Sequence, residues 1–463
     1  MENSLIELEI TGITHEGKGV GRYQGLAVFV KGALTGELVR VSLGRNKKSY
    51  AEGVLKELII TSPHRIEPSC TSYTRCGGCQ LLHLEYKEQL AEKTKIVANA
   101  LKRIGGFAYV EVNQCMGMDI PWEYRNKIIF QIGRENREDK DSSIKLGFFE
   151  DNSNKFVPGK NCLLVSLDLK ALANELERLI NDYALDKLKK VLIRESAFNN
   201  EFLLGLIFAD DSHDRLQVSK FAEEIKNLFP KIVSIIESVV PDSKVPWKGK
   251  NRVLYGTGYF LEKVNGKKII VSANSFFQVN SLQTEKLYEC VINFAKYDNA
   301  GIVFDLYSGT GTISILLGEI AKQVYGIESL EEAVKNARAN ASLNDMKNVE
   351  FILGKAEIEA KKLVKTGIKP DIIVVDPPRK GCHQELLDTI IDVKPEKVIY
   401  VSCNPATLAR DLKVLSECYK VEEVQPIDMF PQTAHVETIV SLRRQNTYNY
   451  IGIKRKTRCL AGF

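Results

Sequence analysis

Short apolar runs rich in valine and isoleucine recur through the last third of the chain, separated by longer segments with helical periodicity. Four of these runs end in an acidic or small polar residue, at 302–305, 323–328, 371–376 and 397–402. Uninterrupted apolar runs of this length are typical of strands buried on both faces of a parallel sheet. The pattern predicts an α/β, Rossmann-like domain in this part of the chain.

The first 60 residues instead alternate apolar and polar positions. The runs IELEITGI, VGRYQGLAVFV and ELVRVSL are separated by Gly-rich turns, which predicts a small β-barrel. Residues 84–104 form an amphipathic pattern that two glycines end, which predicts a helix. Residues 121–270 combine strand-like runs with helical patterns at 168–184 and 214–229, and predict an α+β domain.

Cys403 follows the run KVIYVS and directly precedes Asn404 and Pro405. Proline suits the first turn of a helix, and the helix dipole lowers the pKa of a thiol at that end. We therefore expect a reactive thiol. A small buried hydrophobe is the alternative.

The loop SGTGT follows the first of these strands and leads into an apolar helix. Its glycines, Gly309 and Gly311, let the backbone approach a ligand, and ligands bind at the carboxyl ends of such strands. A tight strand-to-helix turn could use the same glycines. Glu328 ends the next strand, 23 residues after Asp305, where an acid that binds a ribose is expected.

A further strand ends in the sequence DPPRKG, which begins at Asp376. Enzymes that methylate amino groups of adenine or glutamine carry a similar acid-Pro-Pro turn followed by an aromatic residue. Arg379 stands at that position here, which disfavours this activity. A turn with no substrate role is the alternative.

Cys70, Cys76 and Cys79 have the spacing CxxxxxCGGC, which places three thiolates on one Gly-rich loop. Three soft ligands suit an iron-sulfur cluster or zinc. The fourth ligand is not local. Radical enzymes usually carry CxxxCxxC, so the longer first gap favours a structural or RNA-binding role for the metal.

Composition narrows the class of protein only in part. The chain has 463 residues, 44% of them hydrophobic, which suffices for several domains. No apolar run reaches membrane-spanning length and residues 1–30 lack a signal-peptide core, which favours a cytoplasmic protein with no membrane partner. The net charge of +5 is concentrated from Arg443 onward, so RNA binding requires a local basic face.

Taken together, SGTGT, Glu328, DPPRKG, SCNP, SANSFFQVN at 272–280 and QTAHVETIV at 432–440 resemble the family of S-adenosylmethionine-dependent RNA uracil-5-methyltransferases. The resemblance spans nearly the whole chain. It implies that Cys403 is the nucleophile and Glu437 the general base. It also implies an S-adenosylmethionine site formed by Gln278, Tyr307, Thr312, Glu328 and Asp376. Family members often have Cys-Gly where this chain has Ser308-Gly309.

The chemistry explains why these residue types are needed. Carbon 5 of uracil is too poor a nucleophile to attack a methyl sulfonium, so a thiolate first adds to carbon 6 and converts the ring into an enolate. The enolate takes the methyl group, and a base then removes the hydrogen on carbon 5 so that the thiol is eliminated. An isolated Glu437 would be interpreted as an exposed carboxylate on a strand. Apolar residues alternate around it, however, which predicts that its side chain is partly buried.

The resemblance extends to both other parts of the chain. The first 60 residues resemble the TRAM domain, with candidate RNA contacts at Lys18, Arg22, Tyr23, Arg45, Lys47 and Lys48; a structural cap is the alternative. The cysteines resemble a [4Fe-4S] site. This resemblance implies that Cys162 is the fourth ligand beside Cys70, Cys76 and Cys79, and Cys115 is the alternative fourth ligand.

The implied architecture is a TRAM-like barrel (1–60), a central iron-sulfur and RNA-binding domain (61–83 and 113–270), a methyltransferase domain (84–112 and 271–445) and a basic tail (446–463). Family members with both the barrel and the cysteines look more like 23S rRNA enzymes, so we expect 23S rRNA to be the substrate. We also expect the protein to be a monomer. A tRNA T-loop uridine is the alternative substrate. Cytosine-5 methylation is disfavoured because those enzymes set their thiol in other motifs. A non-catalytic RNA-binding or ribosome assembly factor is the alternative of another class, and the joint presence of Cys403 and Glu437 disfavours it.

Overall fold

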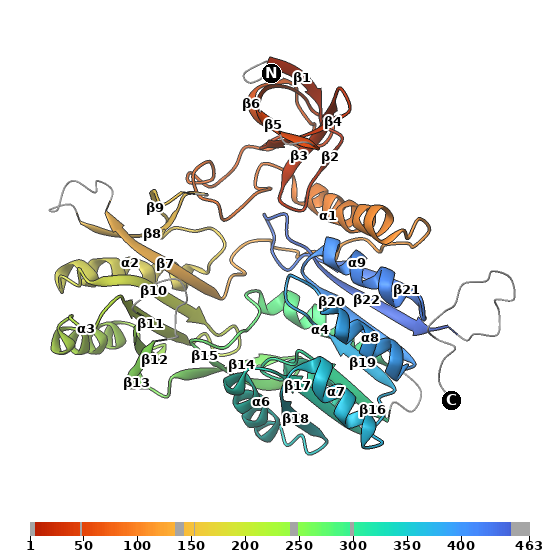
Figure 1. Ribbon diagram of the computed structural model, residues 1–463. Coiled ribbons are helices and arrows are strands. Elements are labelled where there is room, and N and C mark those ends of the chain that lie inside the picture. The colour runs from red at the N-terminus through yellow and green to blue at the C-terminus, as the bar shows by residue number, and fades with distance from the viewer. Residues whose placement is uncertain are drawn as a thin grey trace, which may run out of the picture.

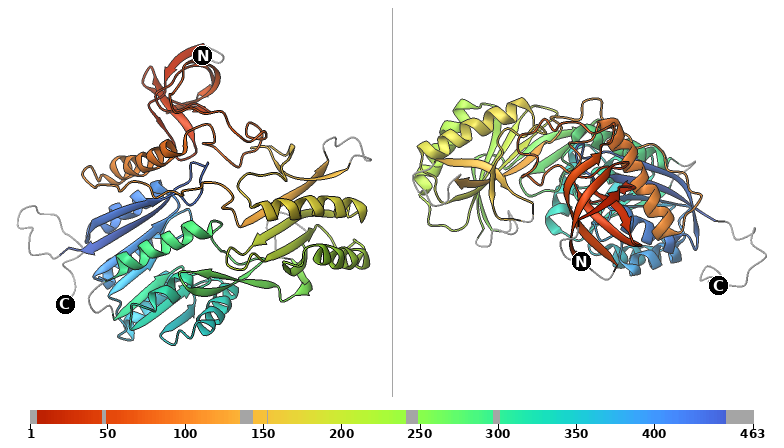
Figure 2. Two further views of the ribbon diagram at one scale, coloured as in Figure 1. Left: turned by 180° about the vertical axis from the view of Figure 1, so that it is seen from behind. Right: turned by 90° about the horizontal axis from the view of Figure 1, so that it is seen from above.

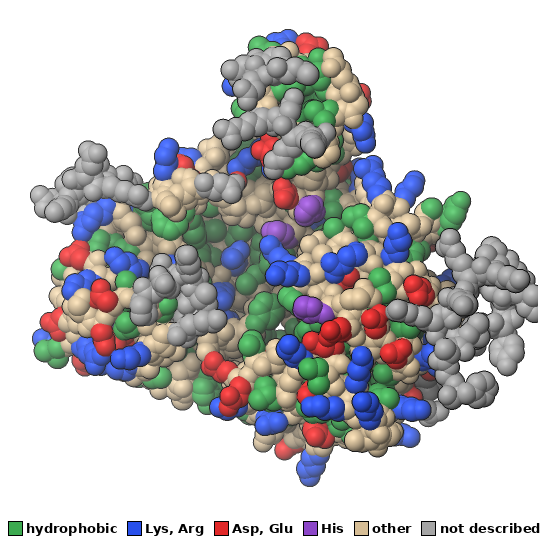
Figure 3. Space-filling view, in the orientation of Figure 1, with side chains coloured by type: hydrophobic (Ala, Val, Ile, Leu, Met, Phe, Trp, Pro, Cys, Tyr) green, Lys and Arg blue, Asp and Glu red, His purple; other side chains and the backbone are tan. Residues whose placement is uncertain are grey.

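The computed structural model describes residues 5–46, 49–134, 143–151, 153–240, 249–296 and 301–445 (Figure 1). Three large sheets and a two-stranded hairpin organise this part of the chain, and the molecule is hollowed where the parts that carry the large sheets meet (Figure 3). None of the helices within these ranges is long and apolar enough to cross a bilayer. The predicted basic tail, 446–463, lies outside the described residues.

The N-terminal sheet curls into a half-barrel at the top of Figure 1, as the alternating pattern predicts. Along its first strand Ile6 and Leu8 are buried, whereas Leu5, Glu7 and Glu9 are exposed. The strands follow the order β1-β5-β6-β4-β3-β2, with bounds β1 Leu5–Glu9, β2 Gly12–Ile13, β3 Lys18–Tyr23, β4 Leu26–Lys31, β5 Leu38–Asn46 and β6 Tyr50–Ile60.

The central sheet carries two helices on one face, and it confirms the predicted mixture of strands and helices (Figure 2). Ser166 caps α2 by accepting a hydrogen bond from the Leu169 amide, and Asp214 caps α3 in the same way. The elements are β7 Lys127–Arg134, β8 Ile144–Phe149, β9 Phe156–Pro158, α2 Leu167–Asp182, β10 Leu188–Glu195, β11 Phe202–Phe208, α3 Arg215–Leu228, β12 Ile232–Val239 and β13 Lys250–Gly256, in the sheet order β13-β12-β11-β10-β7-β8-β9.

The helix predicted at 84–104 forms as α1 (Tyr86–Ala100), but its last turn widens into a π-helix, η1 (Leu101–Gly105). Gly106 ends it with a φ of 80°, a left-handed conformation that glycine adopts without strain. Val97 and Leu101 are buried against helix α9 (Pro405–Leu415). The helix is therefore separate in space from the central sheet that follows it in the chain.

The third sheet is Rossmann-like, as predicted, with the order β18-β17-β16-β19-β20-β22-β21. Strands β16 to β20 run parallel, whereas β22 lies antiparallel between β20 and β21. The strands are β16 Ile302–Leu306, β17 Gln323–Glu328, β18 Val349–Leu353, β19 Ile372–Val375, β20 Lys397–Ser402, β21 Tyr419–Ile427 and β22 Glu437–Arg444.

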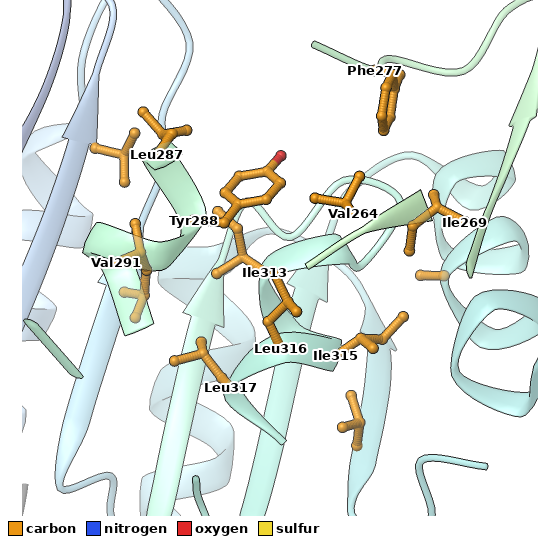
Figure 4. Packing of buried hydrophobic residues seen from close by; sticks show 14 of the residues in the cluster. Val264, Ile269, Phe277, Leu287, Tyr288, Val291, Ile313, Ile315, Leu316 and Leu317 are labelled. Carbon is orange, nitrogen blue, oxygen red and sulfur yellow. The ribbon is translucent and has the colours of Figure 1, made fainter. Parts of the chain in front are cut away.

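Helices cover both faces of this sheet, which explains its uninterrupted apolar strands. Helices α4, α5 and α6 pack on one face, and α1, α7, α8 and α9 on the other. The hairpin of β14 and β15 packs with the first group, where Val264 and Ile269 lie near Ile315 (Figure 4). The remaining bounds are β14 Tyr259–Val264, β15 Lys267–Ser272, α4 Ser281–Ala295, α5 Thr312–Leu317, α6 Glu331–Leu343, α7 Ala356–Lys365 and α8 Gln384–Val393.

Candidate active site

Adjacent parallel strands bring the candidate residues to one edge of the third sheet. In the order β17-β16-β19-β20, Glu328 ends the first strand, Asp305 lies near the end of the second, Asp376 follows the third and Cys403 follows the fourth. The carboxyl ends of neighbouring parallel strands lie at the same edge, which is where doubly wound sheets bind ligands. Residues far apart in the sequence therefore share one rim.

The Gly-rich loop after β16 is held tightly by its surroundings. Gly311 has a φ of 82°, and a Cβ added to it would meet the Phe351 ring at 2.4 Å. The Glu328 carboxylate accepts hydrogen bonds from the Gly309 amide at 3.1 Å and the Leu330 amide at 2.8 Å. The Ser329 hydroxyl also donates to this carboxylate at 3.1 Å. A carboxylate has about four acceptor positions, so Glu328 can still accept from a ribose hydroxyl.

The other predicted cofactor residues lie around this loop or in the segment before α4. Tyr307 adopts a φ of 68°, and its buried hydroxyl has no hydrogen-bond partner among the described residues. Thr312 is buried at the start of α5. Gln278 is buried between β15 and α4, where its main-chain oxygen accepts a hydrogen bond from Asn126 at 3.0 Å. No described contact joins Gln278 to the Gly-rich loop.

Two aspartates at the rim are held as unusual acids. Burial raises the pKa of Asp305 to about 7, although a hydrogen bond from Ser314 opposes the shift. Burial, followed by the charge of Asp305, raises the pKa of Asp376 to about 7. Figure 4 shows Tyr288 of α4 beside Ile313. Burial, followed by the charges of both aspartates and of Glu437, raises the pKa of Tyr288. The rim thus concentrates carboxyl groups whose ionised forms are disfavoured.

The register of β20 and β22 places the predicted nucleophile near the predicted base. Ser402, the last residue of β20, pairs with Thr438 of the antiparallel strand β22. Cys403 follows Ser402 and Glu437 precedes Thr438, so Cys403 and Glu437 lie at the same edge of the sheet. Burial, followed by the charge of Asp376, raises the pKa of Glu437 to about 8. The sequence alone could not supply this pairing, because an antiparallel strand inserted after a parallel one leaves no spacing signal.

Our expectation that the Cys403 thiol has a lowered pKa was wrong. Its pKa is raised to about 11, first by burial and then by the charges of Glu437 and Asp376, while Arg379 opposes the shift. The helix start itself is as predicted, with the Asn404 side chain capping α9 through the Ala406 amide at 3.0 Å. Burial, together with the neighbouring carboxyls, therefore outweighs the effect of the helix N-terminus on the thiol pKa.

Helix α9 also holds the turn that carries Arg379. The Arg379 carbonyl accepts hydrogen bonds from the Asn404 side chain at 3.2 Å and the Thr407 hydroxyl at 3.3 Å. Asp411 accepts from the Cys382 amide at 2.8 Å and from the Tyr400 hydroxyl at 2.6 Å. The thiol and the main chain of Arg379, whose charge opposes the pKa shift of that thiol, are thus held by one helix. Sequence reasoning used Arg379 only to exclude another activity, and missed this role.

A buried ion pair anchors the segment that leads to Glu437. Lys93 of α1 and Asp428 are both fully buried and form an ion pair, and Lys93 also donates to the Phe430 carbonyl at 3.1 Å. The Tyr86 hydroxyl donates to Asp428 at 2.8 Å. A buried lysine in an amphipathic helix carries no local signal, so sequence reasoning missed this contact as well as Tyr288.

The predicted metal ligands line one cavity of about 1000 Å³ between the cysteine loop and the central sheet. Burial, followed by the thiols of Cys162, Cys76 and Cys70, raises the pKa of Cys79 to about 12. Cys115 lies elsewhere, buried beside α1, where its amide donates to the Thr94 hydroxyl at 2.9 Å.

Thiols are the donors that both zinc and iron-sulfur clusters use, and four of them line this cavity. Within the described ranges, no three Cys, His, Asp or Glu side chains are placed closely enough to hold a metal ion.

The candidate RNA contacts of the half-barrel differ in availability. Lys18 pairs with Glu52 at 3.1 Å and Glu16 at 3.5 Å. Arg22 is exposed, and its guanidinium donates to the Gly25 carbonyl at 3.1 Å, while Tyr23 is half-buried. Arg45 lies in β5, and Lys47 and Lys48 lie outside the described residues.

A Rossmann-like sheet with a Gly-rich loop, an acid at the end of the second strand and a rim thiol defines a methyltransferase-like fold and site. Comparison with known proteins specifies the family. The model for tRNA (uracil-5-)-methyltransferase matches residues 85–445, and the TRAM domain model matches residues 1–56. The chain belongs to the S-adenosylmethionine-dependent RNA (uracil-5-)-methyltransferase family and carries a TRAM domain.

Individual relatives agree along the whole chain. An uncharacterized RNA methyltransferase of Bacillus cereus is 40% identical over 454 residues, covering 96% of this chain and 97% of its own. One of Caldanaerobacter subterraneus is 41% identical over 449 residues, covering 95% and 98%. The structure of Pyrococcus abyssi tRNA (uracil-54, C5)-methyltransferase in complex with S-adenosyl-L-homocysteine is 27% identical, with a TM-score of 0.74, and covers 94% of this chain and 100% of its own.

Proposed function

We propose that this protein methylates carbon 5 of a specific uridine in 23S rRNA, with Cys403 as the nucleophile and Glu437 as the general base. The observation that carries the catalytic assignment is the meeting of these two residues at the rim, where the charge of Glu437 raises the pKa of the Cys403 thiol. The choice of 23S rRNA is supported by the combination of a TRAM domain with the cysteine loop.

A tRNA T-loop uridine is the second candidate substrate. It is favoured by the Pyrococcus abyssi protein, whose name states that it acts on uracil 54 of tRNA, and by the name of the matching family. Quantifying 5-methyluridine in ribosomal and transfer RNA from cells with and without the gene separates the two. Loss of the base from 23S rRNA alone supports our choice, and loss from tRNA alone overturns it.

In this mechanism the rim carboxyls move protons. Cys403 passes its proton to the Asp376 carboxylate and adds to carbon 6, which makes carbon 5 nucleophilic toward the methyl group of S-adenosylmethionine. Glu437 then takes the proton from carbon 5, the bond between Cys403 and carbon 6 breaks, and Asp376 returns its proton to the thiolate. Glu328, Asp376, Tyr307, Thr312 and Gln278 hold the cofactor.

The raised pKa values fit a site that receives a cation. Burial, followed by the charges of nearby carboxylates, raises the pKa values of Asp305 and Asp376 to about 7 and that of Glu437 to about 8, so these groups are partly protonated at neutral pH. The sulfonium of S-adenosylmethionine is positively charged, so its arrival favours the ionised carboxyls. The base is thereby charged when the methyl donor is bound.

The two catalytic roles are separable because they act at different stages. Cys403→Ala should give neither methylated RNA nor a covalent complex. Glu437→Gln keeps the nucleophile but lacks the base, so methylated uracil should stay bonded to Cys403 and survive denaturing electrophoresis. Cys290→Ala, which changes a thiol of α4 away from the rim, is the matched control and should behave as wild type.

Two results would reassign the roles. A covalent complex of normal abundance in Cys403→Ala would exclude this thiol as the nucleophile. Normal turnover by Glu437→Gln would show that another group, such as water held by Asp376, is the base.

We further propose that Cys70, Cys76, Cys79 and Cys162 hold a [4Fe-4S] cluster, and that residues 61–83 and 113–270 form its domain. The support is the convergence of these thiols on one cavity. Anaerobically purified protein should be brown and contain about four iron atoms per chain. Cys162→Ser should lose iron, whereas Cys115→Ser should not. One zinc per chain and no iron would contradict the cluster.

A further inference from the structure

A second cavity, of about 640 Å³, lies between the half-barrel and the methyltransferase sheet. One wall is formed by β2, β3 and β4, and the facing wall by α1 and the π-helix η1. Pro405 and Ala406 close its inner end. The cavity therefore reaches the first turn of α9, immediately after Cys403.

The lining of this groove is basic on both walls. Arg22 and His15 project from the half-barrel and Arg103 from η1, and no acidic side chain of the described residues lines the groove. Arg103 is exposed and forms no ion pair with any described residue, and the exposed Lys102 adjoins it. Unpaired cations facing each other across a narrow space repel, unless an anion lies between them.

The π-helix explains why Arg103 of η1 faces the groove. Gly105 lies so close to α9 that a Cβ added there would meet the Ala409 carbonyl oxygen at 3.1 Å and the Phe107 ring at 2.5 Å. This contact fixes the inner side of the turn. The exposed side, Lys102 to Ile104, is thereby turned away from α9, and Arg103 and Ile104 line the groove. π-Helical turns inside α-helices are frequent at functional sites.

We propose that this groove binds the single-stranded RNA that adjoins the target uridine, with Arg22 and Arg103 on opposite sides of its phosphates. The inference rests on the proposed function and deepens it. RNA is favoured because the groove combines cations with an aromatic ring, Phe29, in its wall and continues to the helix that presents Cys403. An acidic peptide could also neutralise the cations, but its binding would not explain why the groove reaches the helix that follows the nucleophile.

The test measures methyl transfer from labelled S-adenosylmethionine to RNA isolated from cells that lack the gene. Arg103→Glu should raise the KM for RNA by about tenfold or more with kcat nearly unchanged, and should reduce the salt dependence of binding by about one phosphate contact. Arg103→Lys should restore most of the affinity because it keeps the charge. Arg22→Glu should act like Arg103→Glu from the opposite wall.

Lys361→Glu is the matched control, because it reverses an exposed charge on α7, outside the groove. Equal KM values for Arg103→Glu and Lys361→Glu would overturn the groove. So would a fall in kcat without a change in KM.

A transcript carrying 5-fluorouridine separates this test from the proposed function. The fluorine at carbon 5 cannot be removed by a base, so an active enzyme stays bonded to the RNA through Cys403. Failure of the wild type to form this complex with either ribosomal or transfer RNA would defeat the proposed function itself. A wild-type complex that Arg103→Glu forms only at about tenfold higher protein concentration supports the groove.

Discussion

Cys403 and Cys79 are both thiols whose pKa is raised by burial, but their neighbours differ. Cys403 lies at the rim of a parallel sheet beside the carboxyls of Glu437 and Asp376. Cys79 lies in a cavity beside three other thiols. A neighbouring carboxylate can accept a proton, whereas neighbouring thiols can share a metal centre.

The comparison shows that chemistry follows from the surrounding residues more than from the cysteine. Both sites gather groups that become anionic, and each requires positive charge from a ligand to hold them in that state. At the rim that charge is the sulfonium of the methyl donor. In the cavity we assign it to the metal ions.

The largest expected effect is a reciprocal loss of function at the two sites. Cys403→Ser should lower kcat by roughly 10⁴-fold or more, because a hydroxyl is a far weaker nucleophile, and should leave the metal content unchanged. Cys79→Ser should release the metal but keep Cys403 able to form the covalent complex. Metal analysis and trapping with 5-fluorouridine RNA measure both. Loss of metal in Cys403→Ser would break the distinction between the sites.

Lys93→Met should destabilise the rim but not the cavity. It leaves Asp428 as a buried charge without its cation, which costs roughly 3 to 5 kcal/mol. The double variant Lys93→Met/Asp428→Leu removes both charges and should recover most of that stability. Denaturant unfolding followed by methyl-transfer activity, with metal content as the reference, is the measurement. Equal stability of the single and double variants would refute the account.

Glu328→Ala should weaken S-adenosylmethionine binding by roughly 1.5 to 3 kcal/mol, the range for hydrogen bonds to a charged group. It also frees the Gly309 amide, so part of this loss reflects the loop. Glu331→Ala, which changes an exposed acid at the start of α6, is the control. Calorimetry that finds unchanged affinity for Glu328→Ala would remove this residue from the site.

The smallest expected effect is a difference in the pH dependence of binding between the charged methyl donor and its product. Asp305 and Asp376 have pKa values near 7 and Glu437 near 8, all raised. Between about pH 4 and pH 8 the folded protein therefore holds protons that the unfolded chain has lost, so its stability falls as pH rises.

A bound sulfonium opposes this trend. Affinity for S-adenosylmethionine should rise by about tenfold from pH 6 to pH 9, one pKa unit of coupling, while affinity for the uncharged thioether S-adenosylhomocysteine rises less. Calorimetry with both ligands measures the difference. Parallel pH profiles would show that the rim carboxyls do not sense the sulfonium.

The strand ends of the third sheet were predictable because uninterrupted apolar runs identify buried parallel strands. Asp305, Glu328, Asp376 and Cys403 were placed on that basis, and the structure has them on neighbouring strands. The half-barrel and the two helices of the central domain were predictable for the same kind of reason, since each has a clear period and helix caps.

Other features depend on tertiary contacts that leave no local pattern. The pKa of Cys403 was predicted in the wrong direction, because burial and then the carboxyls of Glu437 and Asp376, which come from other strands, raise it. Likewise, Lys93 is buried where α1 meets Asp428 and Phe430, which are distant in sequence. The π-helix at the end of α1 was expected as an ordinary helix, because its widening follows from the close contact of Gly105 with α9.

The two chain segments that join the central sheet to the methyltransferase sheet run side by side. Arg125 forms a bridge with Asn280, and the Asn126 amide donates to the Val279 carbonyl at 2.8 Å. Leu192, Leu203 and Ile236 of the central sheet also pack into the same core as the β14–β15 hairpin, so the two sheets are joined over an area and not along a single line. Such a joint resists bending. It holds the seam segment with Gln278, the residue that we propose contacts the cofactor, at a fixed position relative to both sheets.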